Sequence, residues 1–496
     1  MILLLILFPA ACGLVGMMIR ADRLRRALLL LAALGHSAGT AWAWHYVAAS
    51  SRPISELGGL LALDSLEMLF LGITSALFLA AAIYVVGYLA REPRHAQSDT
   101  QEGFLFTNTR EATFTLCLLL FLSTMTLVAA SQHLGVLWVA VEATTLASAP
   151  LIYFHRHHRS LEATWKYLLI CSVGIAIALL GNFFLAAACP NPHGGQAIGM
   201  MLSDLTEHAN ELNPTWLKAA FLLLLVGYGT KMGLAPLHTW LPDAHSEAPS
   251  VISALLSGAL LNCAFLAILR IHAVLGRAGL ANFSQDLLVV FGLVSMGFAA
   301  VFIISQSDYK RMLAYSSVEH MGILAFGIGI GGQAVFGSLL HSVNHSLTKA
   351  MLFLAAGNIL ALYKTKSTAD VQGLARALPI TGVLWIAGFL AITGSPPFGP
   401  FVSELKILFA AMHDHVVATA IFLALLGVIF VAMSRIVLQM AYGPCPQKLA
   451  AESRREPVLA VLPPVMLAVA VLVLGLYVPP GLTQAIQKAA AAIGGP

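Results

Sequence analysis

Apolar blocks of about 18–25 residues dominate the sequence, and each is long enough to cross the ~30 Å hydrocarbon core of a bilayer as an α-helix. A helix pairs its own backbone amides, so such a block leaves no unsatisfied backbone group in lipid. Of the 496 residues, 59% are hydrophobic and only 10% are charged, whereas roughly a quarter of a soluble domain is charged. The chain is therefore predicted to be an all-α, polytopic membrane protein.

Hydropathy predicts about 14 membrane spans. They fall near residues 1–19, 26–48, 63–90, 112–130, 133–154, 162–187, 216–236, 247–273, 284–305, 309–331, 334–362, 378–412, 415–441 and 457–478. Lysine and arginine gather in alternate loops, about 17 against about 5, which predicts both termini on the non-cytoplasmic side of the cell inner (cytoplasmic) membrane. The smaller set holds Arg52, Lys218, Arg270, Arg277 and Lys488. Basic clusters placed between apolar blocks indicate topology and not a nucleic-acid surface.

Two spans contain helix breakers in their middle. Span 7 reads GYGTKMGLAPLHTWLPDAH (227–245), and span 12 reads AITGSPPFGPFVSELKIL (391–408). Proline cannot donate a backbone hydrogen bond, and the carbonyls freed at a break must face protein or a wet cavity. These broken helices are the expected places of ion handling.

The breaks stand five spans apart, which predicts two related repeats. Glu142 and Lys166 in spans 5 and 6 recur as Glu319 and Lys349 in spans 10 and 11. Because five is odd, the second copy would enter the membrane from the opposite face, as in transporters with inverted repeats. The predicted units are residues 1–111 (spans 1–3), 112–275 (spans 4–8), 276–442 (spans 9–13) and 443–496 (span 14 and tail).

Ionisable residues inside these spans are the candidate proton path. Such a group at the bilayer centre costs about 3 kcal/mol or more, so it needs a partner, a cavity or a function. The candidates are Glu142, Lys231, His238, Glu319, His320, His341, His345, Lys349 and Glu404. A buried lysine changes its affinity for a proton when a neighbouring carboxylate moves or changes charge. Glu142 and Lys231 suit such a switch, and histidines could link the lysines.

Other polar residues have a plainer interpretation. Lys166, Lys310, Arg311 and Lys406 lie near span ends, where snorkelling to the interface is favoured over a transport role. His341 and His345 have the i, i+4 spacing of a two-histidine metal site, but no HExxH motif or third ligand accompanies them. A proton relay is therefore favoured over zinc, and no metal ligand is assigned.

The cysteines are predicted to be packing residues. Cys12, Cys117, Cys171, Cys189, Cys263 and Cys445 form no CxxC pair and show no metal-ligand spacing. No cofactor is therefore expected in this chain.

Four motifs in order carry a family resemblance. They are KMGLAPLHTWLPDAHSEAPSVISALLSG (231–258), DYKRMLAYSSVEHMG (308–322), HSLTKAMLFLAAG (345–357) and GSPPFGPFVSELKIL (394–408). Together they resemble the proton-pumping, antiporter-like membrane subunits of respiratory complex I, a family that includes Mrp-type cation/proton antiporter subunits and the membrane arms of group 4 hydrogenases. The resemblance covers about residues 60–440, and VEHMG is most similar to the hydrogenase-4 component F branch.

This resemblance implies roles for individual residues. The family's glutamate of span 5 matches Glu142, its lysine of the broken span 7 matches Lys231, and its lysine of span 11 matches Lys349. The residue that ends the path in span 12 matches Glu404. Span 8 departs from the pattern. Complex I subunits commonly carry a lysine or histidine there, whereas SALLSGALLNCA offers only Ser257 and Asn262, so water held by these two would have to bridge the path.

Three functions follow as hypotheses. The favoured one is a proton-translocating subunit driven by redox chemistry in partners: other membrane subunits and a peripheral arm with iron–sulfur clusters and, in a hydrogenase-type complex, nickel–iron. The second is an Mrp-type cation/proton antiporter subunit without redox partners, and the third is a membrane scaffold with a degenerate path. The electron donor and acceptor, and H⁺ against Na⁺, stay open.

Overall fold

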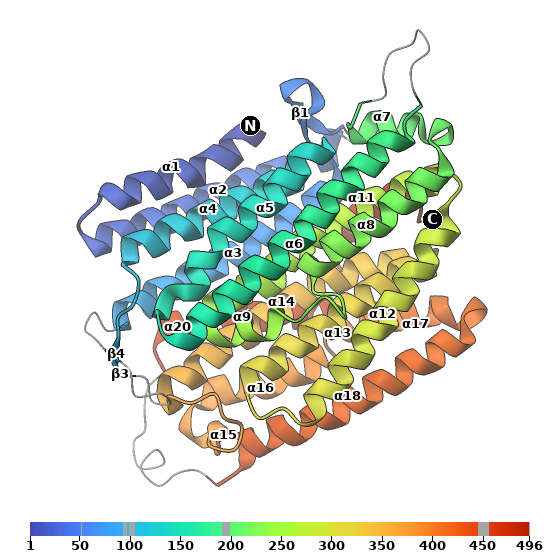
Figure 1. Cartoon of the computed structure of the whole chain (residues 1–496). Helices are drawn as coiled ribbons and strands as arrows, with labels where there is room; N and C mark the ends of the chain where they lie inside the picture. The colour runs from blue at the N-terminus through green and yellow to red at the C-terminus, as the bar shows by residue number, and fades with distance from the viewer. Residues whose placement is uncertain (51, 93–96, 99–104, 191–198, 445–455, 496) are drawn as a thin grey trace.

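The computed structural model of the chain describes residues 1–50, 52–92, 97–98, 105–190, 199–444 and 456–495. Figure 1 shows a bundle of long helices lying side by side, from α1 (Ile2–Met18) and α2 (Asp22–Ser50) at one end to α17 (Gly399–Asp414) and α18 (Val416–Tyr442) at the other. Strands are short in the described part: β1 (Ile54–Glu56) pairs antiparallel with β2 (Leu61–Leu63), and β3 (Gln97–Ser98) with β4 (Leu105–Phe106). The all-α prediction is confirmed.

The remaining helices complete the bundle. They are α3 (Ser65–Arg91), α4 (Glu111–Ala130), α5 (Leu134–Ile152), α6 (His158–Ala188), α7 (Leu202–Glu207), α8 (Pro214–Met232), α9 (Leu241–Glu247), α10 (Ser250–Leu255), η4 (Leu256–Leu260), α11 (Leu261–Arg277), α12 (Ala281–Ile304), α13 (Tyr309–Ile330), α14 (Gln333–Tyr363), α15 (Leu374–Ala377), α16 (Pro379–Ile392), α20 (Val458–Leu476) and α21 (Pro480–Ala492), with short 3₁₀ turns η1 (Leu57–Gly59), η2 (Tyr153–His155) and η3 (Ala209–Glu211).

Eleven helical segments among the described residues are long and apolar enough to cross a membrane. α1 and α16 are apolar but shorter. Each of the spans expected from hydropathy overlaps a helix, and spans 7 and 12 fall on the interrupted pairs α8–α9 and α16–α17. The polytopic membrane fold is therefore confirmed.

Both breaks are built from glycine and proline. α8 ends at Met232 because Gly233 adopts a left-handed φ of 85°, a conformation open to glycine at little cost. α16 ends at Ile392, and Gly394 has φ 63°. Each second half-helix, α9 and α17, has a proline in its first turn, where the missing N–H would be unpaired anyway. The prediction of two broken helices is confirmed.

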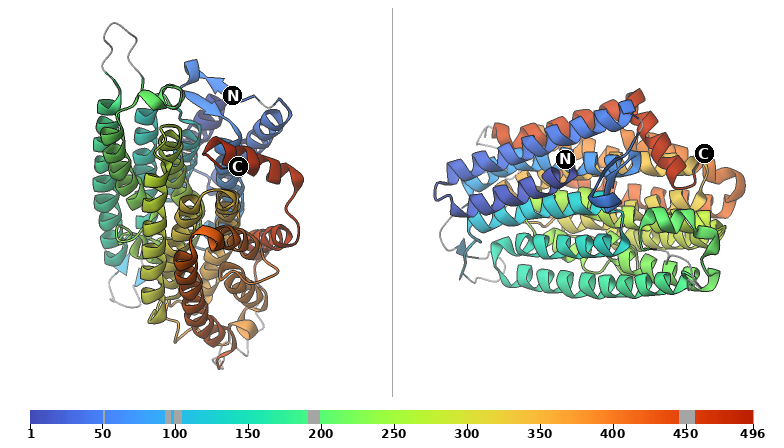
Figure 2. Two further views of the ribbon diagram at one scale, coloured as in Figure 1. Left: turned by 90° about the vertical axis from the view of Figure 1, so that its right-hand side faces the viewer. Right: turned by 90° about the horizontal axis from the view of Figure 1, so that it is seen from above.

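The centre of the bundle is the segment Ser250–Arg277. Every residue in its most apolar 18-residue stretch is buried, against 22% for α18, so the segment is internal and α18 is peripheral, as the two views in Figure 2 also indicate. Its middle part, η4, is one wide π-helical turn. The amide of Asn262 donates to the Gly258 carbonyl of this turn at 2.8 Å.

Arg270 lies inside this central segment and not in a loop. The positive-charge count treated it as a loop residue, which is wrong: its side chain is buried in α11 and pairs with Glu67 of α3 at 3.0 Å. It also donates to the carbonyls of Val128 and Ala129. A buried arginine persists where a carboxylate and carbonyls satisfy it, so this pair ties three helices together.

Of the described cysteines, all but the half-buried Cys189 are buried, as expected for packing residues. Cys445 lies outside the described residues.

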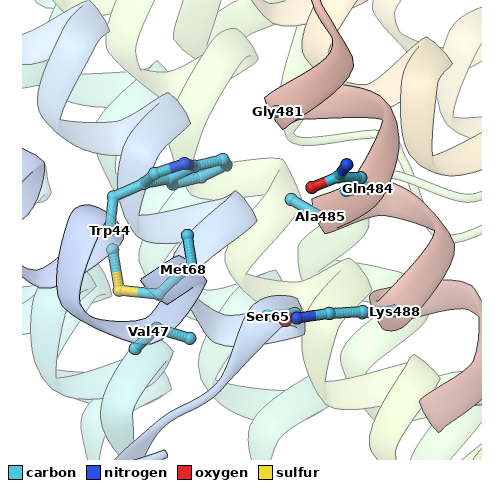
Figure 3. Close-up of a pocket in the computed structure, with 9 residues that line it drawn as sticks. Trp44, Val47, Ser65, Met68, Gly481, Gln484, Ala485 and Lys488 are labelled. Atoms are coloured by element: carbon cyan, nitrogen blue, oxygen red, sulfur yellow. The ribbon is translucent and has the colours of Figure 1, made fainter. Parts of the chain in front are cut away.

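The C-terminal helix α21 covers the end of the bundle formed by α2 and the start of α3. Figure 3 shows Gln484 of α21 across a small pocket from Trp44, with Lys488 of the same helix extending toward Ser65. Its volume of about 50 Å³ suits water and falls far short of the several hundred Å³ of a typical ligand site. The Met1 amine pairs with Glu56 near the same end, so both ends of the described chain lie toward one rim.

Candidate proton path

Lys231 is held in the last turn of α8, just before the first break. Its side chain is 1% exposed, and its Nζ donates to Thr145 Oγ1 at 2.6 Å and Tyr167 Oη at 2.8 Å. Close packing of α6 on α8 brings Tyr167 within reach, because a Cβ on Gly227 would meet the Gly174 carbonyl at 2.6 Å. The ammonium also lies 4.7 Å from the centre of the Tyr167 ring, a distance at which a cation is attracted to an aromatic face.

Glu142 is joined to this lysine by one hydroxyl. Its carboxylate accepts from Thr145 Oγ1 at 3.2 Å and from Ser172 Oγ at 2.8 Å. The Thr145 hydroxyl therefore accepts from the Lys231 ammonium and donates to Glu142, which is half-buried on α5. Among the described residues no direct ion pair joins the two charges. The structure thus brings together the pair that the sequence singled out, with Thr145 as the link.

An aromatic row leads from this site to the middle of the bundle. Tyr167 packs against Trp240 at 4.9 Å between ring centres, Trp240 stacks on His245, and His245 stacks on Phe353 of α14 at 5.2 Å. His245 is fully buried, and neither ring nitrogen has a hydrogen-bond partner in the described structure. A buried polar group without a protein partner is rare, which makes His245 a candidate functional residue.

Sequence reasoning chose His238 from this segment and missed His245. His238 is buried too, but it sits in the turn between α8 and α9 against the rings of Phe298 and Tyr315. His245 ends the half-helix α9, on the central side of the break. The available signal was its place in the same motif, directly beyond the proline that starts α9.

Span 8 contributes hydroxyl and amide groups to the centre. Ser257 Oγ lies 2.8 Å from Ser317 Oγ of α13, and Asn262 Nδ2 donates to Ser346 Oγ of α14 at 2.7 Å. Both residues are fully buried. The two secondary candidates therefore join the helices that carry the second half of the path.

Lys349 is a buried lysine in the second half of the candidate path. Its Nζ donates to the Leu313 carbonyl at 2.6 Å and to the Ser316 hydroxyl. Glu319 lies one helical turn beyond Ser316 on α13, and its Oε2 has no hydrogen-bond partner among the described residues. Lys349 and Glu319 are close enough for their charges to interact. This region thus repeats the lysine–carboxylate combination of the first half.

Beyond Lys349 lies a group of three histidines and Glu404. His320 Nδ1 and His341 Nε2 are 2.9 Å apart, and His341 Nδ1 lies 3.0 Å from Ser403 Oγ. The His345 ring is centred 5.1 Å from that of His320. Glu404 is buried beneath the second break, with its carboxylate against Gly394.

The structure brings together a set of candidate metal ligands other than the His341–His345 pair considered from the sequence. One ligand atom from each of His320, His341 and Glu404 lies within 4.8 Å of the other two. The sequence could not show this, because the three residues come from α13, α14 and α17.

The lysines that lie near span ends fall into two groups. Lys310 is not a snorkelling residue: it is 1% exposed, and its Nζ donates to the carbonyls of Ser246 and Ala248 at 2.9 and 2.6 Å. These carbonyls end α9, which explains why a lysine is held there. Lys166 is partly exposed and pairs with Glu162 and Asp243, and Lys406 is exposed beside Phe336. For these two, the interfacial interpretation agrees with the structure.

Comparison with known proteins gives a consistent result. Residues 131–433 match the family described as "NADH:quinone oxidoreductase/Mrp antiporter, TM". The chain is 40% identical over 356 residues to a hydrogenase-4 component F homolog of Methylacidiphilum infernorum, covering 71% of this chain and 73% of the relative. It is 29% identical to hydrogenase-4 component B of Escherichia coli, covering 69% of this chain and 50% of the relative.

Solved structures share the fold. A chain of an archaeal membrane-bound sulfane sulfur reductase superposes with a TM-score of 0.87 at 23% identity, covering 100% of this chain and 98% of that one. A chain of the Mrp complex from Dietzia sp. gives 0.82 at 21% identity, covering 99% and 96%. A chain of respiratory complex I from Thermus thermophilus gives 0.74 at 22%, covering 96% of each.

Proposed function

We propose that this chain, which belongs to the NADH:quinone oxidoreductase/Mrp antiporter transmembrane family, translocates protons as a subunit of a redox-driven membrane complex. Its relatives include components of hydrogenase-4 and a subunit of an F(420)H(2) dehydrogenase of Methanosarcina mazei. The names of these relatives support the proposal that a partner subunit supplies redox energy. The observation that carries the proposal is the hydrogen-bonded chain Glu142–Thr145–Lys231, in which Thr145 and Lys231 are buried and Glu142 is half-buried.

That chain can act as a charge switch. A charge change in a neighbouring subunit next to α5 would pull or repel the half-buried Glu142. Because Thr145 holds both groups, a change at Glu142 alters the hydrogen bond that stabilises the Lys231 ammonium. Lys231 then releases or takes up a proton, since a buried ammonium depends strongly on its few partners.

The second half of the path receives that proton. His245, whose two ring nitrogens have no partner among the described residues, would pass it through water toward Lys349. Ser257 and Asn262 would hold further water in the middle of span 8, where the segment 253–264 carries no lysine or histidine. From Lys349 the proton would continue past Glu319 and the histidines to Glu404. His238 lies beside the first break and would serve as an accessory proton site there.

The finer assignments belong to the same proposal. Iron–sulfur clusters, and nickel–iron in a hydrogenase-type complex, would reside in a peripheral arm and not in this chain. The chain would lie in the cell inner membrane with both termini on the non-cytoplasmic side. Residues 112–275 and 276–442 would be inverted repeats, an arrangement supported by the break that each contains.

An Mrp-type antiporter without redox partners is the second candidate, supported by the superposition on the Dietzia Mrp chain. The residues required are nearly the same. Purification of the intact complex and identification of its subunits separates the two, because only the first function requires cluster-binding partners.

Lys231→Ala tests the proposal. Proton uptake into vesicles that contain the complex, energised by its own electron donor, is expected to fall about 100-fold or more, the scale of a lost acid–base group. Lys218→Ala is the matched control, because Lys218 is exposed at the opposite end of α8. Assembly of the complex should survive both changes. Normal uptake by an assembled Lys231→Ala complex would refute the assignment.

A further inference from the structure

The group formed by His320, His341 and Glu404 is more than a stretch of the proton path. Two imidazoles and one carboxylate converge from α13, α14 and α17, and one ligand atom of each lies within 4.8 Å of the others. We propose that these three residues form a binding site for a divalent transition-metal ion of the zinc class.

The tautomer of His341 favours this site. Ser403 Oγ donates to the Pro400 carbonyl at 2.9 Å, so it accepts from His341 Nδ1 at 3.0 Å. The Nδ1 of His341 therefore carries the proton, and Nε2 presents a lone pair toward His320. A histidine ligand held by a hydrogen bond at its other nitrogen is the usual arrangement at metal sites.

The spacing of the nitrogens requires only a small adjustment. His320 Nδ1 and His341 Nε2 are 2.9 Å apart. Two nitrogens bound tetrahedrally to zinc at about 2.0–2.1 Å lie about 3.4 Å apart, so the rings must separate by about half an ångström. His320 must also place its proton on Nε2, which frees Nδ1 to bind.

Charge and unsatisfied atoms also indicate a cation. Glu404 is buried, and its Oε1 has no hydrogen-bond partner in the described structure. Glu319 lies close enough to Glu404 for their charges to interact. Two carboxylates would balance a dication in a region where an unpaired charge is costly. Two nitrogen donors against one coordinating carboxylate favour zinc over calcium or magnesium, which prefer oxygen.

The turn at the second break lies next to the site. The turn between α16 and α17 carries the exposed residues Pro396 and Pro397, and Gly394 of the same turn contacts the Glu404 carboxylate. The site is therefore separated from the molecular surface by one turn of chain. Bound metal would hold Glu404 and His341 and remove them from the proton path. That inhibitory consequence rests on the proposed function, whereas binding itself does not.

Co²⁺ titration of the purified, chelator-treated complex tests binding without any transport assay. Cobalt in a site with histidine and carboxylate ligands gives visible d–d absorption, and Zn²⁺ should displace it. His341→Gln and Glu404→Gln are each expected to weaken cobalt affinity at least tenfold, as loss of a ligand should exceed the 10–100-fold effect of outer groups. His345→Gln, one turn along α14, should leave affinity unchanged.

Two further variants keep the test decisive. Ser403→Ala removes the hydrogen-bond partner of His341 Nδ1 without changing a ligand, and it should weaken cobalt binding about tenfold. This variant replaces His341→Gln in the test when the His341→Gln complex does not assemble. His36→Gln changes a buried histidine of α2 that contacts Ser75 and Thr126, and it should have no effect. Equal cobalt affinity in wild type, Glu404→Gln and Ser403→Ala would overturn the proposal, as would an equal loss in His345→Gln.

Discussion

Each of the two helix breaks has a buried charged residue beside it, and the two charges are of opposite sign. Lys231 lies in the last turn of α8, before the first break, and Glu404 lies in the second turn of α17, after the second break. A cation is favoured at a helix C-terminus and an anion near an N-terminus. The sign of each buried charge therefore matches the half-helix that carries it.

The two buried charges, Lys231 and Glu404, differ in how completely their hydrogen bonds are satisfied. At the first, Lys231 donates to two hydroxyls, the Ala235 amide donates to Ser295 Oγ, and Trp240 Nε1 donates to the Thr230 carbonyl. At the second, Glu404 Oε1 has no partner among the described residues. The Lys231 ammonium is therefore held by protein hydroxyls, whereas Glu404 keeps one oxygen that could bind water or an ion.

Among the variants that compare the two breaks, Glu404→Gln should reduce proton uptake the most. It removes the charge of the second break but keeps its shape, and no hydrogen bond to Oε1 is lost. We expect proton uptake to fall about 100-fold, with the thermal unfolding temperature of the complex nearly unchanged. Lys406→Gln on the same helix is the control, because Lys406 is exposed. Uptake at the wild-type rate would show that the second break does not carry protons.

Glycine substitutions at the two breaks should separate transport from stability. Gly233→Ala and Gly394→Ala both force alanine into a left-handed backbone, which costs about 1–2 kcal/mol. A Cβ at position 233 meets the flexible end of Leu241 at 2.5 Å, but at position 394 it meets the Glu404 carboxylate. Both variants should unfold at a lower temperature, and only Gly394→Ala should reduce uptake per assembled complex. Equal uptake in the two variants would contradict the placement of Glu404.

Tyr167→Phe should have a smaller effect at the first break. The change removes one of the two hydroxyls that bind Lys231 but keeps the ring beneath the ammonium. Loss of one hydrogen bond to a charged group costs about 1.5–3 kcal/mol, so uptake should fall about tenfold or more and its pH profile should shift. Tyr315→Phe offers a comparable tyrosine away from Lys231, with an expected effect near zero. An unchanged pH profile in Tyr167→Phe would remove Tyr167 from the switch.

Lys166→Met should have the smallest effect, although Lys166 is the neighbour of Tyr167. Its partly exposed pairs with Glu162 and Asp243 contribute at most about 1 kcal/mol. Uptake within twofold of wild type is the expected result, measured beside Tyr167→Phe. A loss as large as that of Lys231→Ala would mean that the path runs along the outer face of α6.

The sequence predicted the helices and breaks well because both depend on local chemistry. Runs of apolar residues define spans, and the glycines and prolines around Gly233 and Pro400 mark the two breaks. It also predicted Lys231, Lys349 and Glu404 as buried, because a charge inside an apolar block has few other reasons to be there.

Partners across helices could not be read from the sequence. Thr145 and Tyr167 are ordinary span residues until α5, α6 and α8 are assembled, and nothing local indicates that they bind Lys231. Lys310 was misassigned for the same reason, since its position near a span end concealed the α9 carbonyls that receive it. Arg270 looked like a loop charge because Glu67 is some two hundred residues away in the chain.

The wide turn at Leu256–Leu260 gives the innermost helix an unusual mechanical property. A π turn can migrate along a helix by exchanging one backbone hydrogen bond at a time, and each residue that it passes rotates by about 100°. Ser257 lies within this turn, and the Asn262 amide holds one of its carbonyls. If this turn moved by one residue, the Ser257 hydroxyl, which lies 2.8 Å from Ser317 Oγ, would turn toward or away from that serine.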